Sequence, residues 1–333
     1  MWAVWARDSV VRSNKLSARN QKTFARRNVG GNVWLSRSES RQRIDLNALK
    51  PRRLNYEVLE SEESIGRAQL KEIQQAARER EGDLVILLLG GRGAQALYAI
   101  LGQMAKTDEV DDLLSRLHVF TQDALAPMRM NNGLSFVRDF ERLLCESFFK
   151  KVKSFTPMQT DTADLEGELE LYMEKLDSLG GIDIFFLGLG PEAGAASHLA
   201  YIKPGSGATA NDWAGVIPIS TSILEHHVKK FKIGGSTVTE ADEAECRAAT
   251  HILTLGPAAI LKARRIVQSV VDASTAPAKR ESYRRLLDEE IEEDPVRRST
   301  QLDNNPGLWL RLHGNVRSLI LADVLEVQGS TSS

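Results

Sequence analysis

The sequence has few of the residues that mark a secreted, membrane-bound or zinc-binding protein. Its two cysteines, Cys145 and Cys246, are too few for a disulfide framework and lack the spacing of a metal site. This favours a reducing compartment, so we expect a cytoplasmic location. No run of about 18 or more apolar residues occurs, and we expect no membrane partner. Aromatic residues make up only 6% of the chain, which suits an enzyme-like globule better than a β-sandwich or a coiled coil.

Acidic residues are scarce at the N-terminus. Residues 1–43 contain ten Lys or Arg residues but only Asp8 and Glu39, although the whole chain has a net charge of −2. Such an Arg- and Ser-rich leader resembles an organelle transit peptide. A disordered basic extension, or a start codon placed too far upstream, would give the same composition. We expect residues 1–50 to be a basic, disordered extension, with organelle import as the minor alternative. No nucleic-acid-binding module follows it, so we expect no nucleic-acid partner.

Strand-like and helix-like segments alternate over residues 54–325. Ser61 is a suitable N-cap for a helix with an apolar stripe, and the following segment DLVILLLGG (83–91) is a continuous apolar run ended by glycines. Such a run indicates a strand that is buried on both faces of a parallel sheet. The pattern predicts one α/β domain with a single doubly wound, mostly parallel, Rossmann-like sheet flanked by helices.

Two later segments carry weaker patterns. GLWLRLHG (307–314) is a candidate for the closing strand. STSILEHHVKKF (220–231) contains the adjacent His226 and His227. In an extended strand two neighbouring side chains point to opposite faces, and no third ligand lies at a useful spacing. We therefore expect a polar surface pair and no metal site.

The candidate functional residues follow the ends of three predicted strands, and open parallel sheets bind ligands at such ends. The first end is Gly90-Gly91-Arg92-Gly93, and a glycine turn before a helix offers free backbone N–H groups to a phosphate. Arg92 can add a charge-assisted bond, although a tight turn that needs glycine for backbone reasons explains the pattern equally well. The second end carries Asp123, a candidate general base or a turn cap. The third is Gly188-Leu189-Gly190.

The order of these segments resembles the glucosamine-6-phosphate deaminase/isomerase and 6-phosphogluconolactonase superfamily over residues 54–320, most closely its deaminase/isomerase branch. Leu89–Gly93 stands at the family's phosphate turn, and Val119–Asp123 at its strand ending in Asp-Glu. Ser135 stands at its Ser-Tyr or Ser-Asn position. Three longer segments also match family segments: EKLDSLGGIDIFFLGLG (174–190), THILTLGPAAILKARRI (250–266) and STQLDNNPGLWLRL (299–312).

The family's catalytic loop, Gly-x-Gly-x-(Asp/Asn)-Gly-His, can be aligned here in two ways. With four extra residues, His198 takes the place of the catalytic histidine, Ala196 that of the preceding carboxylate, and Lys203 that of the following glutamate. Without a gap, Glu192 stands at the aspartate and Gly194 at the histidine, so the imidazole is lost. In the first alignment Lys203 would lower the pKa of the imidazole, while Glu192 could fold back to replace the missing carboxylate.

The resemblance implies an enzyme that acts on a small-molecule sugar phosphate without a metal or an organic cofactor. Its phosphate would bind the Gly90–Gly93 turn and Lys279. His198 would assist ring opening, and Asp123 would move a proton between C1 and C2. The remaining residues expected near the substrate are Gly188, Gly190, Lys203 and Ser135. A 6-phosphogluconolactonase-like hydrolase and a catalytically silent sugar-phosphate-binding protein are the two alternatives, and a homo-oligomer is left open.

Overall fold

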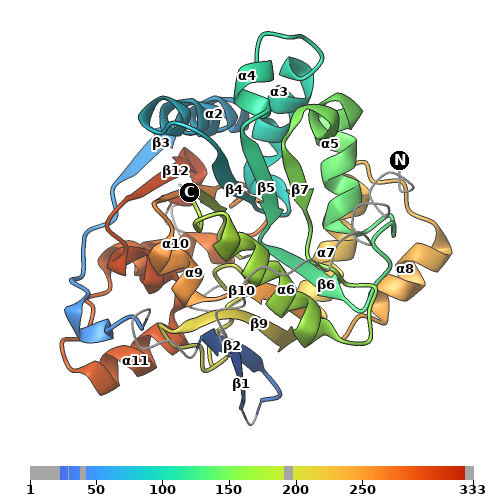
Figure 1. The fold of residues 1–333 in the computed structure, drawn as a ribbon. Coiled ribbons are helices and arrows are strands. Elements are labelled where there is room, and N and C mark those ends of the chain that lie inside the picture. The colour runs from blue at the N-terminus through green and yellow to red at the C-terminus, as the bar shows by residue number, and fades with distance from the viewer. Residues whose placement is uncertain (1–22, 29, 38–42, 191–197, 327–333) are drawn as a thin grey trace, which may run out of the picture.

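A seven-stranded parallel sheet forms the centre of the fold in the order β3-β12-β11-β8-β4-β5-β7 (Figure 1). The computed structural model describes residues 23–28, 30–37, 43–190 and 198–326. The strands of this sheet are β3 (Tyr56–Leu59), β4 (Leu84–Leu88), β5 (Leu117–Thr121), β7 (Ser154–Thr156), β8 (Ile184–Leu187), β11 (Arg265–Val270) and β12 (Val316–Leu321). The parallel Rossmann-like sheet predicted from the apolar runs is confirmed.

Helices cover both faces of this sheet, so alternate side chains of its central strands are buried in two separate apolar clusters. On β4, Ile86 and Leu88 pack in one apolar cluster with helices α2, α3 and α5, whereas Val85 and Leu87 pack in the other with α6 and α9. The long helices are α2 (Glu62–Glu79), α3 (Gln95–Met104), α5 (Phe136–Lys151), α6 (Leu165–Ser178), α7 (Thr221–Ile233), α8 (Glu240–Arg247), α10 (Ala278–Asp288) and α11 (Pro295–Asn304). The short helical segments are η2 (Leu46–Ala48), η3 (Arg92–Ala94), α4 (Asp111–Leu114), α9 (Pro257–Lys262), η4 (Pro306–Leu312) and η5 (Ala322–Val324).

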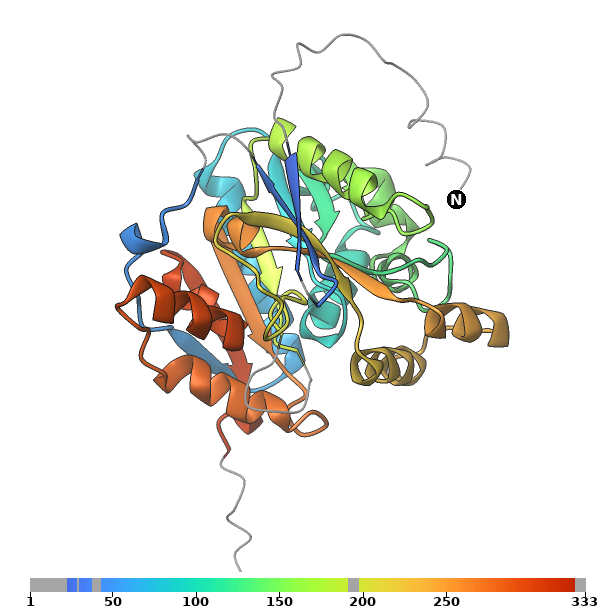
Figure 2. The ribbon, with the colours of Figure 1, turned by 90° about the horizontal axis from the view of Figure 1, so that it is seen from below.

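A second, antiparallel sheet was not predicted. Its strand order is β1-β2-β9-β10-β6, and its strands are β1 (Thr23–Arg27), β2 (Val33–Arg37), β6 (Asp123–Ala126), β9 (Asp212–Pro218) and β10 (His251–Leu255). Figure 2 shows the β1–β2 hairpin lying against β9. The expectation of a disordered extension is therefore wrong for residues 23–27 and 33–37. The physical reason is the apolar sequence Val33-Trp34-Leu35, which is buried in the core although its flanks are basic.

Two local predictions are also wrong. Residues 221–233 form helix α7 rather than a strand, because Ser220 caps its first turn and its apolar side chains at Leu224, Val228 and Phe231 recur at helical spacing on a buried face. Residues 306–312 form η4, in which every residue is buried, so the segment lacks the alternation of a half-exposed strand. The closing strand is β12 instead. No helix in the described part of the chain is both long and apolar enough to cross a membrane.

Candidate functional site

A cavity of about 400 Å³ opens at the carboxyl ends of four neighbouring strands, β11, β8, β4 and β5. It is lined by the segments that directly follow these strands and by one face of α7. Three strand ends singled out from the sequence therefore meet in one place, as expected for an open parallel sheet. The predicted residues that line it are Gly90, Gly91, Arg92, Gly93, Asp123, Gly188, Gly190, His198 and Lys279.

The glycine turn after β4 is both a tight turn and a wall of the cavity. A Cβ atom on Gly90 would lie 2.2 Å from the Phe136 ring, and Gly91 has a φ of +81°, so glycine is needed at both positions. The carbonyl of Gly93 accepts hydrogen bonds from Ser269 Oγ at 2.7 Å and from Gln69 Nε2 at 3.2 Å. The turn is thereby fixed at the N-terminal end of α3, where backbone N–H groups and the helix dipole favour an anion.

Two lysines and an arginine add positive charge to the cavity. Lys279 Nζ lies 2.5 Å from Asp272 Oδ1, and Lys230 Nζ lies 3.4 Å from Asp272 Oδ2. Burial alone would raise the pKa of Asp272, but the two lysines hold it below its usual value. Arg92 is half exposed and pairs with Glu62 at 2.7 Å. Lys230 was missed from the sequence, because its place in the cavity depends on helix α7, and this segment was expected to be extended.

Asp123 is the first residue of β6, and its side chain is buried at the cavity wall with only 3% of its surface exposed. Burial raises the pKa of Asp123 to about 7, and a 3.1 Å hydrogen bond from Gln122 Nε2 to its Oδ2 opposes that rise only in part. Its Oδ1 atom has no hydrogen-bond partner among the described residues. A carboxyl group with such a pKa can both take up and release a proton near neutral pH.

His198 reaches the cavity beside the Gly188–Gly190 turn. Its ring stacks on Tyr201, with 4.4 Å between the ring centroids. A Cβ atom on Gly190 would lie 2.3 Å from the His198 ring, and Gly190 N donates a 3.0 Å hydrogen bond to His198 O. The second glycine of Gly-Leu-Gly is therefore required by close approach of the imidazole.

His226 and His227 are not the surface pair that the sequence led us to expect. Both line the cavity from α7, and His227 is buried, with Nε2 donating to Leu134 O at 2.7 Å. The pKa of each is lowered to about 4, mainly by burial, and for His226 the nearby Lys230 and Lys279 contribute to the decrease. Both imidazoles are accordingly neutral at pH 7. No cluster of three or more His, Cys, Asp or Glu side chains that could hold a metal ion occurs among the described residues.

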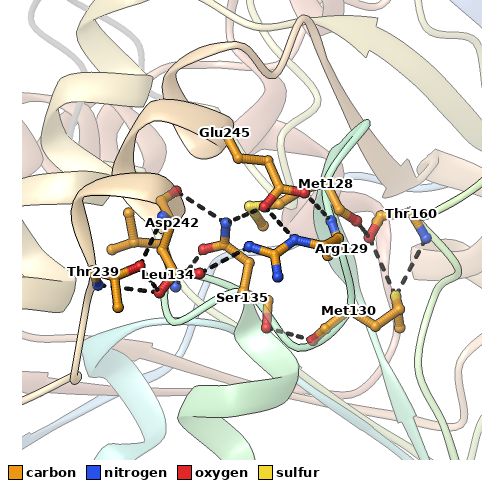
Figure 3. Close-up of polar contacts among 10 residues, drawn as sticks. Met128, Arg129, Met130, Leu134, Ser135, Thr160, Thr239, Asp242 and Glu245 are labelled. Atoms are coloured by element: carbon orange, nitrogen blue, oxygen red, sulfur yellow. Dashed lines mark hydrogen bonds and ion pairs between the residues drawn. The ribbon is translucent and has the colours of Figure 1, made fainter.

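Two predicted residues lie elsewhere, and a third cannot be placed. Lys203 is absent from the cavity lining, and its Nζ donates to Pro218 O at 2.5 Å. Ser135 caps α5 through Arg138 N and donates its hydroxyl to Met130 O at 2.8 Å (Figure 3). These two hydrogen bonds shape the chain between β6 and α5. Glu192 lies outside the described residues.

The loop between β6 and α5 is tied to α8, as Figure 3 shows. Arg129 donates from its backbone N and from Nε to the two carboxylate oxygens of Glu245, at 2.7 and 2.8 Å, and from Nη2 to Asp242 at 3.1 Å. Asn132 Nδ2 donates to the same glutamate at 2.9 Å. These contacts fix the chain that runs from Asp123 to α5 against the helix that follows α7. Neither this loop nor α8 lines the cavity, but each is next in the chain to an element that does.

Comparison with known proteins agrees with this arrangement. The model of the family described as glucosamine-6-phosphate isomerases/6-phosphogluconolactonase matches residues 61–306. A glucosamine-6-phosphate deaminase from Staphylococcus epidermidis is 25% identical over 225 residues, which cover 67% of this chain and 81% of the relative.

Two solved structures share the fold. A monomeric glucosamine-6-phosphate deaminase superposes with a TM-score of 0.62 at 21% identity, covering 81% of this chain and 98% of the other. The 6-phosphogluconolactonase from Trypanosoma cruzi gives a TM-score of 0.59 at 16% identity, covering 83% and 97%. Because the family match spans most of the chain and includes every strand that ends at the cavity, the chain belongs to the glucosamine-6-phosphate isomerase/6-phosphogluconolactonase family.

Proposed function

We propose that this protein is an aldose–ketose isomerase/deaminase that acts on an amino-sugar phosphate of the glucosamine-6-phosphate type. The observation that carries the proposal is the meeting of Asp123, His198 and the Gly90–Gly93 turn in one cavity. The curated relatives named glucosamine-6-phosphate deaminase favour this activity over the others known in the family.

The phosphate would bind at the glycine turn. There the N-terminus of α3 supplies backbone N–H groups, and Lys279 and Lys230 supply charge. Arg92 can turn from Glu62 towards the ligand, since its side chain is half exposed. Asp272 holds the two lysines together, so a bound phosphate would meet them at fixed positions.

Proton transfer would fall to two other groups that line the cavity, His198 and Asp123. His198 would take the proton of the C1 hydroxyl and return one to the ring oxygen, which opens the sugar. Asp123 in its ionised form would take the proton from C2 and deliver it to C1. As the C1 carbonyl oxygen gains a proton and the amino nitrogen loses one, this gives the C2 imine beside a C1 hydroxyl group. Water then hydrolyses the imine to the ketose and ammonia. With a pKa of about 7, Asp123 is basic enough to accept the proton and acidic enough to give it back.

The test uses the full chain with glucosamine-6-phosphate, fructose-6-phosphate and 6-phosphogluconolactone, and with unphosphorylated glucosamine as the ligand control. We expect a thermal shift of about a few degrees with the phosphorylated sugars only, together with ammonia release and ketose formation. Asp123→Asn and His198→Gln should abolish turnover while the thermal shift remains. Asp161→Asn, an exposed carboxylate outside the cavity, is the matched control.

Three other results would count against the proposal. A thermal shift without turnover would indicate a silent sugar-phosphate-binding protein, and lactone hydrolysis without ammonia release would indicate the hydrolase. The absence of any thermal shift would refute the phosphate site.

A cytoplasmic location and assembly into a homo-oligomer stay predictions.

A further inference from the structure

The chain between the cavity and β9 has little structure of its own. Residues 198–212, which we call the connector, begin at His198 and end where β9 starts. Residues 198–211, all of which the structure describes, form no helix or strand apart from a bridge between Leu199 and Ile202. Such a segment keeps one conformation only when other parts of the protein hold its backbone.

The β1–β2 hairpin supplies many of those contacts. The carbonyl of Ser206 accepts one hydrogen bond from Trp34 Nε1 at 2.9 Å and another from Asn28 Nδ2 at 2.6 Å. The next carbonyl, of Gly207, accepts from Arg26 Nη2 at 2.7 Å. Trp34 and Ser206 are almost completely buried, so the hydrogen bond between them is shielded from competing water, whereas the Asn28 bond is partly buried and the Arg26 bond is exposed.

The same hairpin neutralises a buried carboxylate at the end of the connector. Asp212 is fully buried, and its oxygens accept from Arg26 Nη2 at 2.6 Å and from Ser36 Oγ at 2.5 Å. The carboxylate also accepts from Thr209 N at 2.7 Å and from Thr209 Oγ1 at 2.9 Å. A buried charge without its partner is unfavourable, so the hairpin arginine is needed for this turn of the connector.

The beginning of the connector is held at the cavity. Gly190 N donates to His198 O at 3.0 Å, and the amide of Ile202 donates to Leu199 O at 2.8 Å. None of the hairpin residues that the structure describes lines the cavity, and the hairpin lies outside the matched range 61–306. The connector is the part of the chain that joins the hairpin contacts at Ser206 and Gly207 to His198.

We propose that the β1–β2 hairpin, through Arg26, Asn28 and Trp34, is a positioning element of the site that holds the connector so that His198 faces the cavity. Its consequence for turnover rests on the proposed function, whereas the effect on the connector does not. The part of the basic N-terminal segment that forms β1 and β2 then has a role inside the folded domain.

The experiment measures hydrogen exchange in the full chain carrying Arg26→Met, which removes both the Gly207 and the Asp212 contact. Loss of these bonds should speed amide exchange in peptides covering residues 198–206 by about fivefold or more, with exchange in β4 unchanged. Ser36→Ala removes only one hydrogen bond to Asp212, so it should speed amide exchange over residues 198–206 by a smaller factor. This variant replaces Arg26→Met if Arg26→Met does not fold. Phe24→Ala, an exposed side chain of the same hairpin, is the matched control and should leave exchange unaltered.

Kinetics separate positioning from general stability. In Arg26→Met, kcat should fall by about tenfold or more while KM for the sugar phosphate stays within about twofold, because the phosphate turn is untouched. Arg26→Lys, which retains the charge, should restore part of kcat. Exchange that is unchanged, or that rises equally in β4, would overturn the inference. If the unmodified protein shows no turnover, the proposed function fails, and the exchange measurement still decides the role of the hairpin.

Discussion

Replacing Asp123 with asparagine should stabilise the protein at neutral and alkaline pH while removing its proposed activity. The carboxyl group is buried, and its pKa is raised from 3.8 to about 7. Between these two values the folded protein keeps a proton that the unfolded chain has released. The free energy of unfolding therefore falls as the pH rises from about 4 to about 7. Asparagine has nearly the same shape and never ionises, so the variant escapes this loss.

The size of the effect follows from the two pKa values. A rise of about 3 units corresponds to about 4 kcal/mol when each unit contributes 1.36 kcal/mol. The full difference should appear above about pH 8, where Asp123 is ionised in both states. At pH 5 the group is still protonated in the folded protein, and only about 2 kcal/mol should separate the two proteins. The advantage of the variant should thus grow by about 2 to 3 kcal/mol between pH 5 and pH 8.

Urea denaturation of the full chain without ligand, at pH 5 and pH 8, measures this difference directly. Asp161→Asn is the control, since an exposed carboxylate carries no comparable desolvation penalty and its variant should show no such growth. A gap between Asp123→Asn and the unmodified protein that is the same at both pH values would refute the reasoning. The group would then not be held in the protonated form by burial, and the proposed proton exchange at neutral pH would lose its basis.

Three further predictions concern the cavity. The kcat/KM of the unmodified protein should rise as the pH increases through about 7, because the same carboxyl group must lose its proton to act as a base; a flat profile from pH 6 to pH 8 would count against that role. Gly190→Ala should reduce kcat by at least about tenfold, since its Cβ would lie 2.3 Å from the His198 ring. Gly188→Ala is the control: its Cβ would make only an ordinary 3.4 Å contact with Leu89, so kcat should stay close to that of the unmodified protein. Lys230→Met should weaken sugar-phosphate binding by about tenfold in calorimetry, and Lys229→Met, an exposed neighbour on the same helix, should leave it unchanged.

The parallel sheet could be predicted because its signal is local. Segments such as 84–88 are continuously apolar and end in glycine, and strands buried on both faces need that composition. The order of such strands along the chain also placed the turn at Gly90–Gly93, Asp123 and the turn at Gly188–Gly190 at one edge of the sheet. The structure brings these three together.

The antiparallel sheet could not be predicted in the same way, because two of its strands come from a basic segment whose composition hides their tendency to pair. The pairing of β2 with β9 joins residues 33–36 to residues 212–216. A basic leader usually indicates disorder or targeting, and that composition concealed the short apolar sequence around Trp34. Helix α7 was missed because the segment was read as an extended strand, in which His226 and His227 would be polar surface residues. They are polar here because they line a cavity rather than because they face solvent.

The structure also bears on the choice between the two alignments of the catalytic loop. The gapped alignment places an imidazole at His198, and that imidazole does line the cavity, beside the turn that approaches it closely at Gly190. The same alignment raised an objection, since Lys203 would stand where the family has a glutamate and would oppose a protonated histidine. In the structure the Lys203 ammonium group donates to the carbonyl of Pro218, and Lys203 lies outside the cavity lining. If His198 acts as we propose, the substitution at position 203 leaves the loop without one acidic partner, and the proton-transferring imidazole itself is retained at the cavity.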